Sequence, residues 1–150
     1  MNENKPIYRV TRLEPWMLAS VAELERDCFA EPWSENALSL LLGDTAVGYA
    51  CVSDGHVLAY GGMLIAVDEG QITNIAVRAD TRRNGCGRAI LSALEQDAKE
   101  RGLAMISLEV RASNAAAIAL YESFGYQTAG VRRGFYRQPR EDALVMLKTL

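Results

Sequence analysis

The most informative segment of the chain comprises residues 82–91, which read Arg-Arg-Asn-Gly-Cys-Gly-Arg-Ala-Ile-Leu. Before it, residues 71–77 have the composition of a strand. After it, residues 87–101 carry apolar side chains at helical spacing with charged side chains between them. Residues 104–110 alternate apolar and polar side chains, as a second strand does. A strand, a helix and a strand in this order predict a parallel pair joined by a right-handed crossover.

The glycine turn at the centre of this unit favours a phosphate-binding site. Gly85 and Gly87 allow a tight turn and close approach of a ligand, and the following helix offers free N–H groups to an anion. A nucleotide P-loop is excluded because no Lys-Ser or Lys-Thr follows Gly87. A dinucleotide fingerprint is excluded because Ile90 stands where its third small residue is needed. A plain structural turn is the remaining alternative.

The rest of the chain predicts further strands and helices around this unit. Strands are expected at 7–12, 46–53, 56–67, 126–132 and 143–148, and helices at 15–28, 35–42 and 114–123. Turn signals lie at Asp54-Gly55 and at residues 68–70, so the strands on either side should form an antiparallel sheet. Residues 134–139 are expected to form a loop.

Composition limits the class of protein. The chain has 150 residues, 49% of them hydrophobic, which suits a single domain spanning 1–150. A net charge of −3 argues against nucleic-acid binding. The apolar stretch around 38–42 stops at Gly43-Asp44, so no membrane span is expected, and the N-terminus lacks the apolar core of a signal peptide, so a cytoplasmic location is expected.

The three cysteines and the one histidine predict no metal site. The cysteine spacings match no zinc pattern, and Cys28 and Cys51 are expected to be buried thiols. His56 follows a hairpin turn and should be a solvated residue at the start of a strand.

A second motif at residues 108–126 reads Leu-Glu-Val-Arg-Ala-Ser-Asn-Ala-Ala-Ala-Ile-Ala-Leu-Tyr-Glu-Ser-Phe-Gly-Tyr. With Asn74-Ile75-Ala76-Val77 and the glycine turn, it resembles the ribosomal-protein-alanine N-acetyltransferases of the GNAT superfamily. Pro32-Trp33-Ser34-Glu35 and Arg140-Glu141-Asp142-Ala143 extend the resemblance over most of the chain. It implies an α+β (α/β) GNAT fold with a mixed, mostly antiparallel sheet of about seven strands and about four helices on its faces. A central parallel pair should splay apart for acetyl-CoA.

The resemblance also implies an activity. The protein should transfer an acetyl group from acetyl-CoA, without a metal, to the N-terminal α-amine of an alanine in a small-subunit ribosomal protein. No direct nucleic-acid or membrane partner is implied. Two alternatives stay open: a GNAT enzyme for another N-terminus, a lysine or a small amine, and a non-catalytic acyl-CoA-binding module.

Two residues are expected to carry the chemistry. Alternation places Glu109 on the strand face opposite Ile106 and Leu108. An α-amine has a pKa of roughly 8 and must lose a proton before it attacks, and the resemblance makes Glu109 the general base. It makes Tyr121 the general acid for the leaving thiolate. Alternatively, Glu109 is a solvated glutamate near a strand end, and Tyr121 only packs.

The resemblance also assigns binding residues. The acetyl-CoA set comprises Ile75, Ala76, Val77, Arg82, Arg83, Asn84, Gly85, Cys86, Gly87, Arg88, Ala89, Asn114 and Tyr121, in which Ile75 to Val77 pair with the pantetheine arm and the glycine turn holds the pyrophosphate. Asn114 is also the expected N-cap of its helix. The expected acceptor contacts are Glu31, Trp33, Glu35 and Tyr136.

Cys86 suggests a different mechanism within the same fold. It stands at a helix N-terminus beside Arg83 and Arg88, where the pKa of a thiol should fall. Such a thiol could carry the acetyl group between the two substrates. Direct transfer is preferred, because the backbone of Cys86 belongs to the phosphate turn, away from the thioester.

Overall fold

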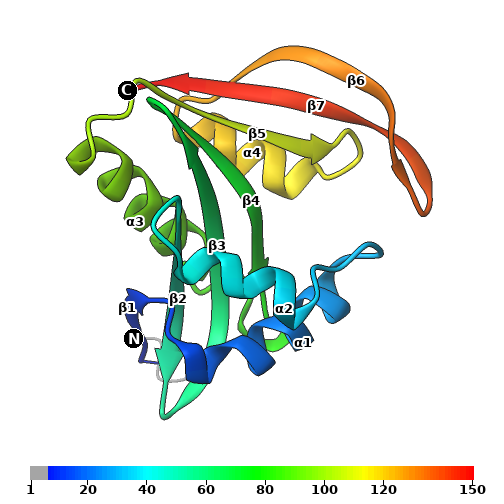
Figure 1. Ribbon diagram of the computed structural model, residues 1–150. Coiled ribbons are helices and arrows are strands. Elements are labelled where there is room, and N and C mark those ends of the chain that lie inside the picture. The colour runs from blue at the N-terminus through cyan, green and yellow to red at the C-terminus, as the bar shows by residue number, and fades with distance from the viewer. Residues whose placement is uncertain (1–6) are drawn as a thin grey trace.

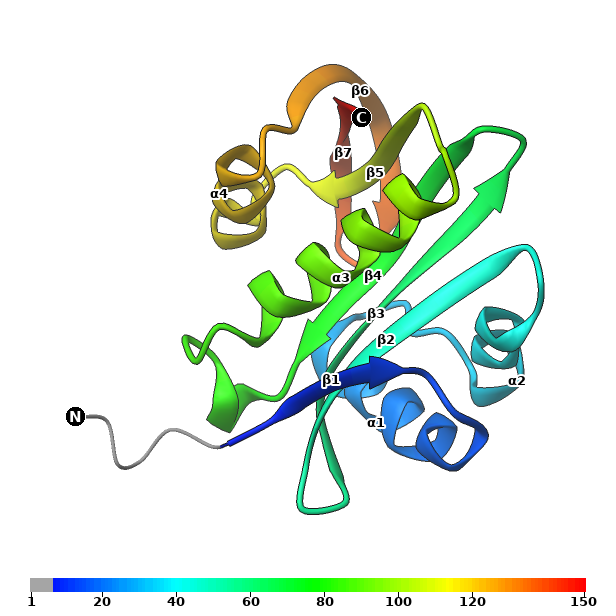
Figure 2. The same ribbon diagram turned by 90° about the vertical axis from the view of Figure 1, so that its left-hand side faces the viewer.

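The structure is a computed structural model that describes residues 7–150. It contains one seven-stranded mixed sheet, in the order β1-β2-β3-β4-β5-β7-β6, with helices on both faces (Figures 1 and 2). The strands are β1 (Arg9–Arg12), β2 (Ala46–Ser53), β3 (His56–Ala66), β4 (Glu69–Val77), β5 (Met105–Arg111), β6 (Gln127–Arg137) and β7 (Arg140–Thr149). The α-helices are α1 (Leu18–Cys28), α2 (Glu35–Leu38), α3 (Cys86–Glu100) and α4 (Ala115–Ser123), with 3-10 turns at Pro15–Met17, Ser39–Leu42 and Ala79–Thr81. The expected α+β architecture is confirmed.

Two hydrophobic clusters hold the helices on opposite faces of the sheet. On one face, Ile90, Leu91 and Leu94 of α3 pack with Val47 and Cys51 of β2. On the other face, residues of α1 and α2 pack with a second set of β2 and β3 side chains. This second cluster comprises Leu18, Val21, Leu38, Ala46, Ala50 and Tyr60, among others. Because successive residues of a strand point to opposite faces, β2 and β3 contribute to both clusters.

The expected parallel pair is β4 and β5, joined through α3. Their pairing covers only Glu69–Gln71 with Met105–Ser107, although β4 continues to Val77 and β5 to Arg111. Figure 1 shows the two strands separating beyond this point. The expected splay is therefore present, and it leaves the side of β4 that faces β5 without a strand partner beyond Gln71.

Three local predictions need correction. The helix expected at 35–42 is one α-helical turn, capped by Ser34 Oγ at 3.1 Å from Ala37 N, followed by a 3-10 turn. The turn expected at 68–70 ends earlier, since β4 begins at Glu69.

The loop expected at 134–139 is instead the end of a long hairpin. β6 runs to Arg137 and β7 starts at Arg140, so only two residues connect them. The pairing of β6 with β7 shifts register at a bulge between Arg132 and Tyr136. Within this bulge Gly134 has a φ of 61° and donates its N–H to Asp142 Oδ1 at 2.8 Å. Glycine and polar residues indicated a loop in the sequence, but the bulge accommodates them without ending the strand.

Candidate active site

Three adjoining cavities surround the gap between β4 and β5. The largest, about 970 Å³, lies between the glycine turn, the end of β4 and α4. A second, about 310 Å³, lies between residues 29–33, β4, β5 and the β6–β7 hairpin. A third, about 160 Å³, shares lining residues with both, including Phe29, Ile75, Glu109 and Tyr121. The splayed strands therefore border a passage that links the α3–α4 side of the molecule to the α1–α2 side.

The glycine turn presents an open helix N-terminus to the largest cavity. Arg83 and Gly85 both have left-handed backbones, with φ of 68° and 83°. The N-cap of α3 is Gly85, which has no side chain to accept from the first N–H groups of the helix. A left-handed non-glycine residue such as Arg83 is strained and is typical of functional turns. The turn is thus shaped to bind an anion, and every residue of the predicted set from Arg82 to Arg88 lines this cavity.

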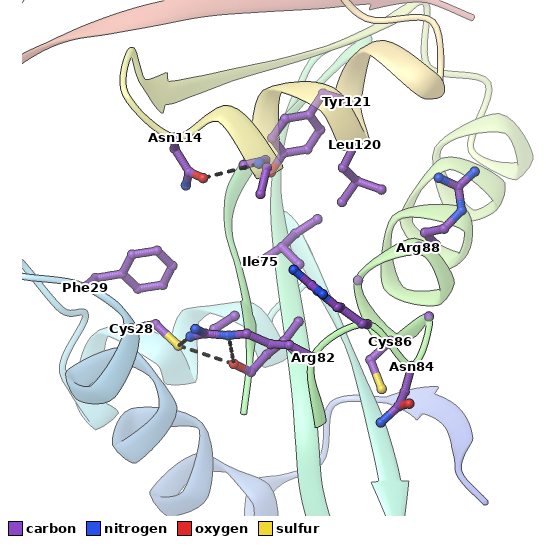
Figure 3. A pocket seen from close by; sticks show the side chains of 17 residues that line it. Cys28, Phe29, Ile75, Arg82, Asn84, Cys86, Arg88, Asn114, Leu120 and Tyr121 are labelled. Carbon is purple, nitrogen blue, oxygen red and sulfur yellow. Dashed lines mark hydrogen bonds between the residues drawn. The ribbon is translucent and has the colours of Figure 1, made fainter. Parts of the chain in front are cut away.

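Two of the arginines bridge the walls of the cavity. Arg82 donates through Nε to the Val77 carbonyl at 3.3 Å and through Nη2 to Cys28 Sγ at 3.7 Å, which ties the turn to the end of α1 (Figure 3). Arg88 donates to Ser123 Oγ at 3.0 Å and lies 4.9 Å from the centre of the Phe124 ring, which ties α3 to α4. Both side chains therefore have protein partners as well as access to a phosphate.

Two of the predictions for the cysteines, the burial of Cys28 and the pKa of Cys86, are wrong. Cys28 is only half-buried and lines the largest cavity, so it is not the buried thiol that was predicted. The expected fall in the pKa of Cys86 is wrong: its side chain is buried in the core beneath α3, and burial raises the pKa of this thiol. Removal from water outweighs the field of the helix N-terminus here. Cys51 is buried as expected, and burial raises its pKa to about 12.

Helix α4 places Asn114 and Tyr121 on the wall shared by the cavities. Asn114 is the N-cap, as predicted, and its Oδ1 accepts from Ala117 N at 3.2 Å (Figure 3). Tyr121 is 6% exposed and makes an edge-to-face contact with Tyr126 at 5.6 Å. Burial, and then the nearby Tyr136, raise the pKa of the Tyr121 hydroxyl above its ordinary value. Its phenol is therefore protonated at neutral pH, as a proton donor must be.

Glu109 lies on β5 and faces the second and third cavities. Its neighbours Leu108 and Val110 point into the core, so the predicted alternation is confirmed. The Glu109 side chain is 17% exposed, and its Oε1 lies 3.3 Å from Nε of Arg132. Its Oε2 accepts a long contact of 3.5 Å from Gln71 Nε2. The carboxylate is thus held by a strand at the centre of the passage.

Three of the four expected acceptor contacts line the second cavity with Glu109. Glu31 and Trp33 come from the α1–α2 connection, and Tyr136 comes from the hairpin. Glu35 is not among the lining residues: it is an exposed residue in the first turn of α2. Glu31 Oε1 accepts from Arg137 N at 2.8 Å, so the two sides of the cavity are joined.

Arg111 fixes the hairpin over this cavity. Its guanidinium donates to the carbonyls of Pro139 and Gln138 at 2.9 and 3.1 Å and pairs with Glu141 at 3.2 Å. It also lies 4.3 Å from the centre of the Tyr136 ring. This one side chain of β5 therefore positions the aromatic ring opposite Glu109.

Sequence reasoning missed several residues of the site. The most informative is Glu25, a fully buried carboxylate in α1. It accepts hydrogen bonds from the Tyr60 hydroxyl, from Asn74 Nδ2 at 3.0 Å and from Trp33 N at 2.8 Å. The signal was present, since Glu25 follows Leu18 by two helical turns on the apolar stripe. Phe29, Gln71, Arg111 and Arg132 gave no comparable signal.

A parallel pair that separates around a passage, with an anion-binding turn at one end, is the architecture expected of acyltransferases of the GNAT class. The sequence comparison agrees. The chain belongs to the Acetyltransferase (GNAT) family, whose sequence profile matches residues 5–126, and it is an acyltransferase.

Two similar relatives are named for the same activity. The chain is 40% identical over 139 residues to the [ribosomal protein bS18]-alanine N-acetyltransferase of Escherichia coli K12, with 91% of this chain and 94% of that protein covered. It is 35% identical over 150 residues to a putative enzyme of the same name from Bacillus subtilis 168, with 99% and 98% covered. The resemblance to ribosomal-protein-alanine N-acetyltransferases is thereby confirmed.

Solved structures agree with this assignment. The crystal structure of the E. coli ribosomal-protein-S18-alanine N-acetyltransferase superimposes with a TM-score of 0.88 at 38% identity, covering 95% of this chain and 94% of that chain. Arabidopsis thaliana NAA60, crystallised with acetyl-CoA, gives a TM-score of 0.86 at 17% identity over 96% and 99% of the two chains, which shows a shared fold.

Within residues 7–150, no helix is both long and apolar enough to cross a membrane. The same residues contain no group of three His, Cys, Asp or Glu side chains placed to hold a metal ion.

Proposed function

We propose that this protein transfers the acetyl group of acetyl-CoA to the α-amine of an N-terminal alanine of a ribosomal protein, in the cytoplasm. The observation that carries the proposal is the row of three cavities that share lining residues: the glycine turn lines the largest, Glu109 lines the second, and Tyr121 and Glu109 both line the third. The activity for which the E. coli and B. subtilis relatives are named supports this choice of acceptor.

The larger cavity suits acetyl-CoA. The free N–H groups at the start of α3 and the side chains of Arg82, Arg83 and Arg88 would hold the pyrophosphate. Because β4 pairs with β5 only as far as Gln71, its backbone at Ile75 to Val77 can pair with the amides of the pantetheine arm. The thioester would then lie near Tyr121, which lines both the first and the third cavity.

The proposed reaction is a direct attack. Glu109 accepts a proton from the α-ammonium group, and the resulting amine attacks the thioester carbonyl carbon. A carbon–nitrogen bond forms, the carbon–sulfur bond breaks, and Tyr121 donates its proton to the leaving thiolate. The nitrogen loses a second proton as the amide forms. This proton restores the Tyr121 phenol through solvent, and Glu109 releases its own proton to solvent afterwards. Tyr121 carries this proton at neutral pH, and the burial that raises its pKa also makes it a weaker acid than an ordinary phenol, so the transfer to the thiolate is uphill.

A peptide panel tests the proposed acceptor. The protein is incubated with acetyl-CoA and peptides that begin with Ala, Ser, Gly or Met, and with an Ala peptide whose α-amine is blocked but which contains a lysine. Mass spectrometry should find the acetyl group on the α-amine, fastest for the Ala peptide, and none on the blocked peptide. Acetylation confined to lysine side chains would overturn the proposal.

Cys86 tests the direct route. Replacement of Cys86 by Ala should leave kcat close to that of the unchanged protein, because the buried thiol has a raised pKa and does not reach the acceptor side of the passage. The backbone N–H at this position survives the change. Initial rates at varied concentrations of both substrates should give intersecting lines. Parallel lines, together with an inactive Cys86→Ala protein, would instead establish an acetylated enzyme intermediate.

A further inference from the structure

The carboxylate of Glu109 already has a cationic partner. Arg132 of β6 pairs with Ala143 of β7, and Glu109 of β5 pairs with Val145 of the same strand. The Arg132 side chain reaches across β7 and places its Nε 3.3 Å from Glu109 Oε1. The two side chains differ in exposure, 60% for Arg132 and 17% for Glu109. A solvent-exposed guanidinium therefore contacts the group that is proposed to receive the proton of the acceptor.

The other polar groups around Glu109 have fixed partners. Arg111 is held by Glu141 and the hairpin carbonyls, and Glu31 is held by the backbone of Arg137. Tyr136 lies under Arg111, and burial together with the Glu109 carboxylate raises the pKa of its hydroxyl. Gln71 makes a long, uncharged contact with Glu109 at 3.5 Å.

Arg132 is held more weakly than these groups. Within residues 7–150 its only ion pair is the one with Glu109, a single contact rather than a two-bond fork. Because the guanidinium of Arg132 is largely exposed, water and salt weaken its pairing with Glu109. Its guanidinium also lies 5.8 Å from the centre of the Phe135 ring on its own strand, a contact that does not depend on Glu109. Arg132 can therefore leave the carboxylate and still have a partner.

We infer that Arg132 occupies the position beside Glu109 that the ammonium group of the acceptor takes, and that the acceptor displaces it. This inference rests on the proposed function, with Glu109 as the base. An α-amine with a pKa of roughly 8 arrives mostly as a cation at neutral pH. Because two cations repel each other beside one carboxylate, the ammonium group must displace Arg132 before it can give up its proton. Arg132 is thus a positioning residue that weakens acceptor binding and favours acceptors able to displace it.

The test separates acceptor binding from chemistry. Arg132→Gln should lower the KM for an Ala-starting peptide by about two- to fivefold at low salt, the range that the loss of one exposed ion pair allows. The kcat and the KM for acetyl-CoA should stay nearly constant, and the fall in peptide KM should shrink in high salt. Arg132→Lys, which keeps the charge, should retain most of the original peptide KM. Arg133→Gln is the matched control, since it removes the same charge from the next residue and has no ion pair among residues 7–150.

Each other outcome counts against the inference. A peptide KM that rises in Arg132→Gln would show that Arg132 binds the acceptor directly, and a fall in kcat would show that it orients Glu109. An unchanged KM would show that the pair plays no part in binding. Glu109→Gln separates the two proposals: if it is inactive while Arg132→Gln behaves like the original protein, only this inference fails, and if it is fully active the proposed mechanism fails as well.

Discussion

Replacement of Glu109 by Gln should lower kcat/KM for an Ala-starting peptide by about 10²–10⁴-fold, the usual contribution of a general base. Glutamine has nearly the same shape and can still contact Gln71, but its amide cannot accept the proton of the ammonium group. Steady-state rates with saturating acetyl-CoA measure the effect. The fall should appear mainly in kcat, because the group acts in the chemical step.

A matched control comes from α4. Glu122→Gln removes one carboxylate from an exposed position of the helix that carries Tyr121, and it should retain the original rate. Calorimetric titration of the Glu109→Gln protein with acetyl-CoA should give the original affinity, because Glu109 does not line the largest cavity. Full activity of Glu109→Gln, or a loss explained by weaker acetyl-CoA binding, would contradict its role as the base.

Replacement of Glu25 by Ala should lower the free energy of unfolding by about 2–4 kcal/mol, because it leaves buried donors without an acceptor. The fully buried carboxylate serves Tyr60, Asn74 and the backbone of Trp33 at once. Urea unfolding followed by circular dichroism measures the change. The peptide KM should rise as well, since Glu25 holds Trp33 at the edge of the acceptor cavity.

Glu23 supplies the comparison on the same helix. It is exposed two residues earlier, so Glu23→Ala should shift the free energy of unfolding by no more than about 0.5 kcal/mol. Glu25→Gln keeps one carbonyl oxygen as an acceptor. Its free energy of unfolding should therefore fall between those of Glu23→Ala and Glu25→Ala. Equal unfolding midpoints for Glu25→Ala and Glu23→Ala would refute the structural importance of the buried carboxylate.

Local patterns predicted the elements around the site well. The change of period after the glycine turn located α3, and alternation in residues 104–110 placed Glu109 opposite the core. The N-cap at Asn114 followed from residue type and position. These features depend on neighbours within a few residues, so a single sequence carries enough information to identify them. The prediction of a loop at 134–139 was wrong because the bulge near Gly134 has the composition of a loop.

Local patterns did not predict the properties that depend on residues distant in the sequence, namely the pKa of Cys86 and the ion pair of Glu109. The helix-terminal position of Cys86 predicted a reactive thiol, but the packing of α3 on the sheet buries it and raises its pKa. Likewise, Arg132 and Glu109 are 23 positions apart in sequence yet lie 3.3 Å apart, because β7 brings β5 and β6 into register.

The residue pattern was therefore sufficient for the order of strands and helices, the glycine turn and the direction in which Glu109 points. It left open how Glu31, Trp33, Tyr136 and Glu109 come to surround one cavity, and which charges are buried or paired there. Burial, ion pairing and cavity shape arise from contacts between segments that are remote in the chain, and hydrophobic periodicity reports only the side of an element that faces inward.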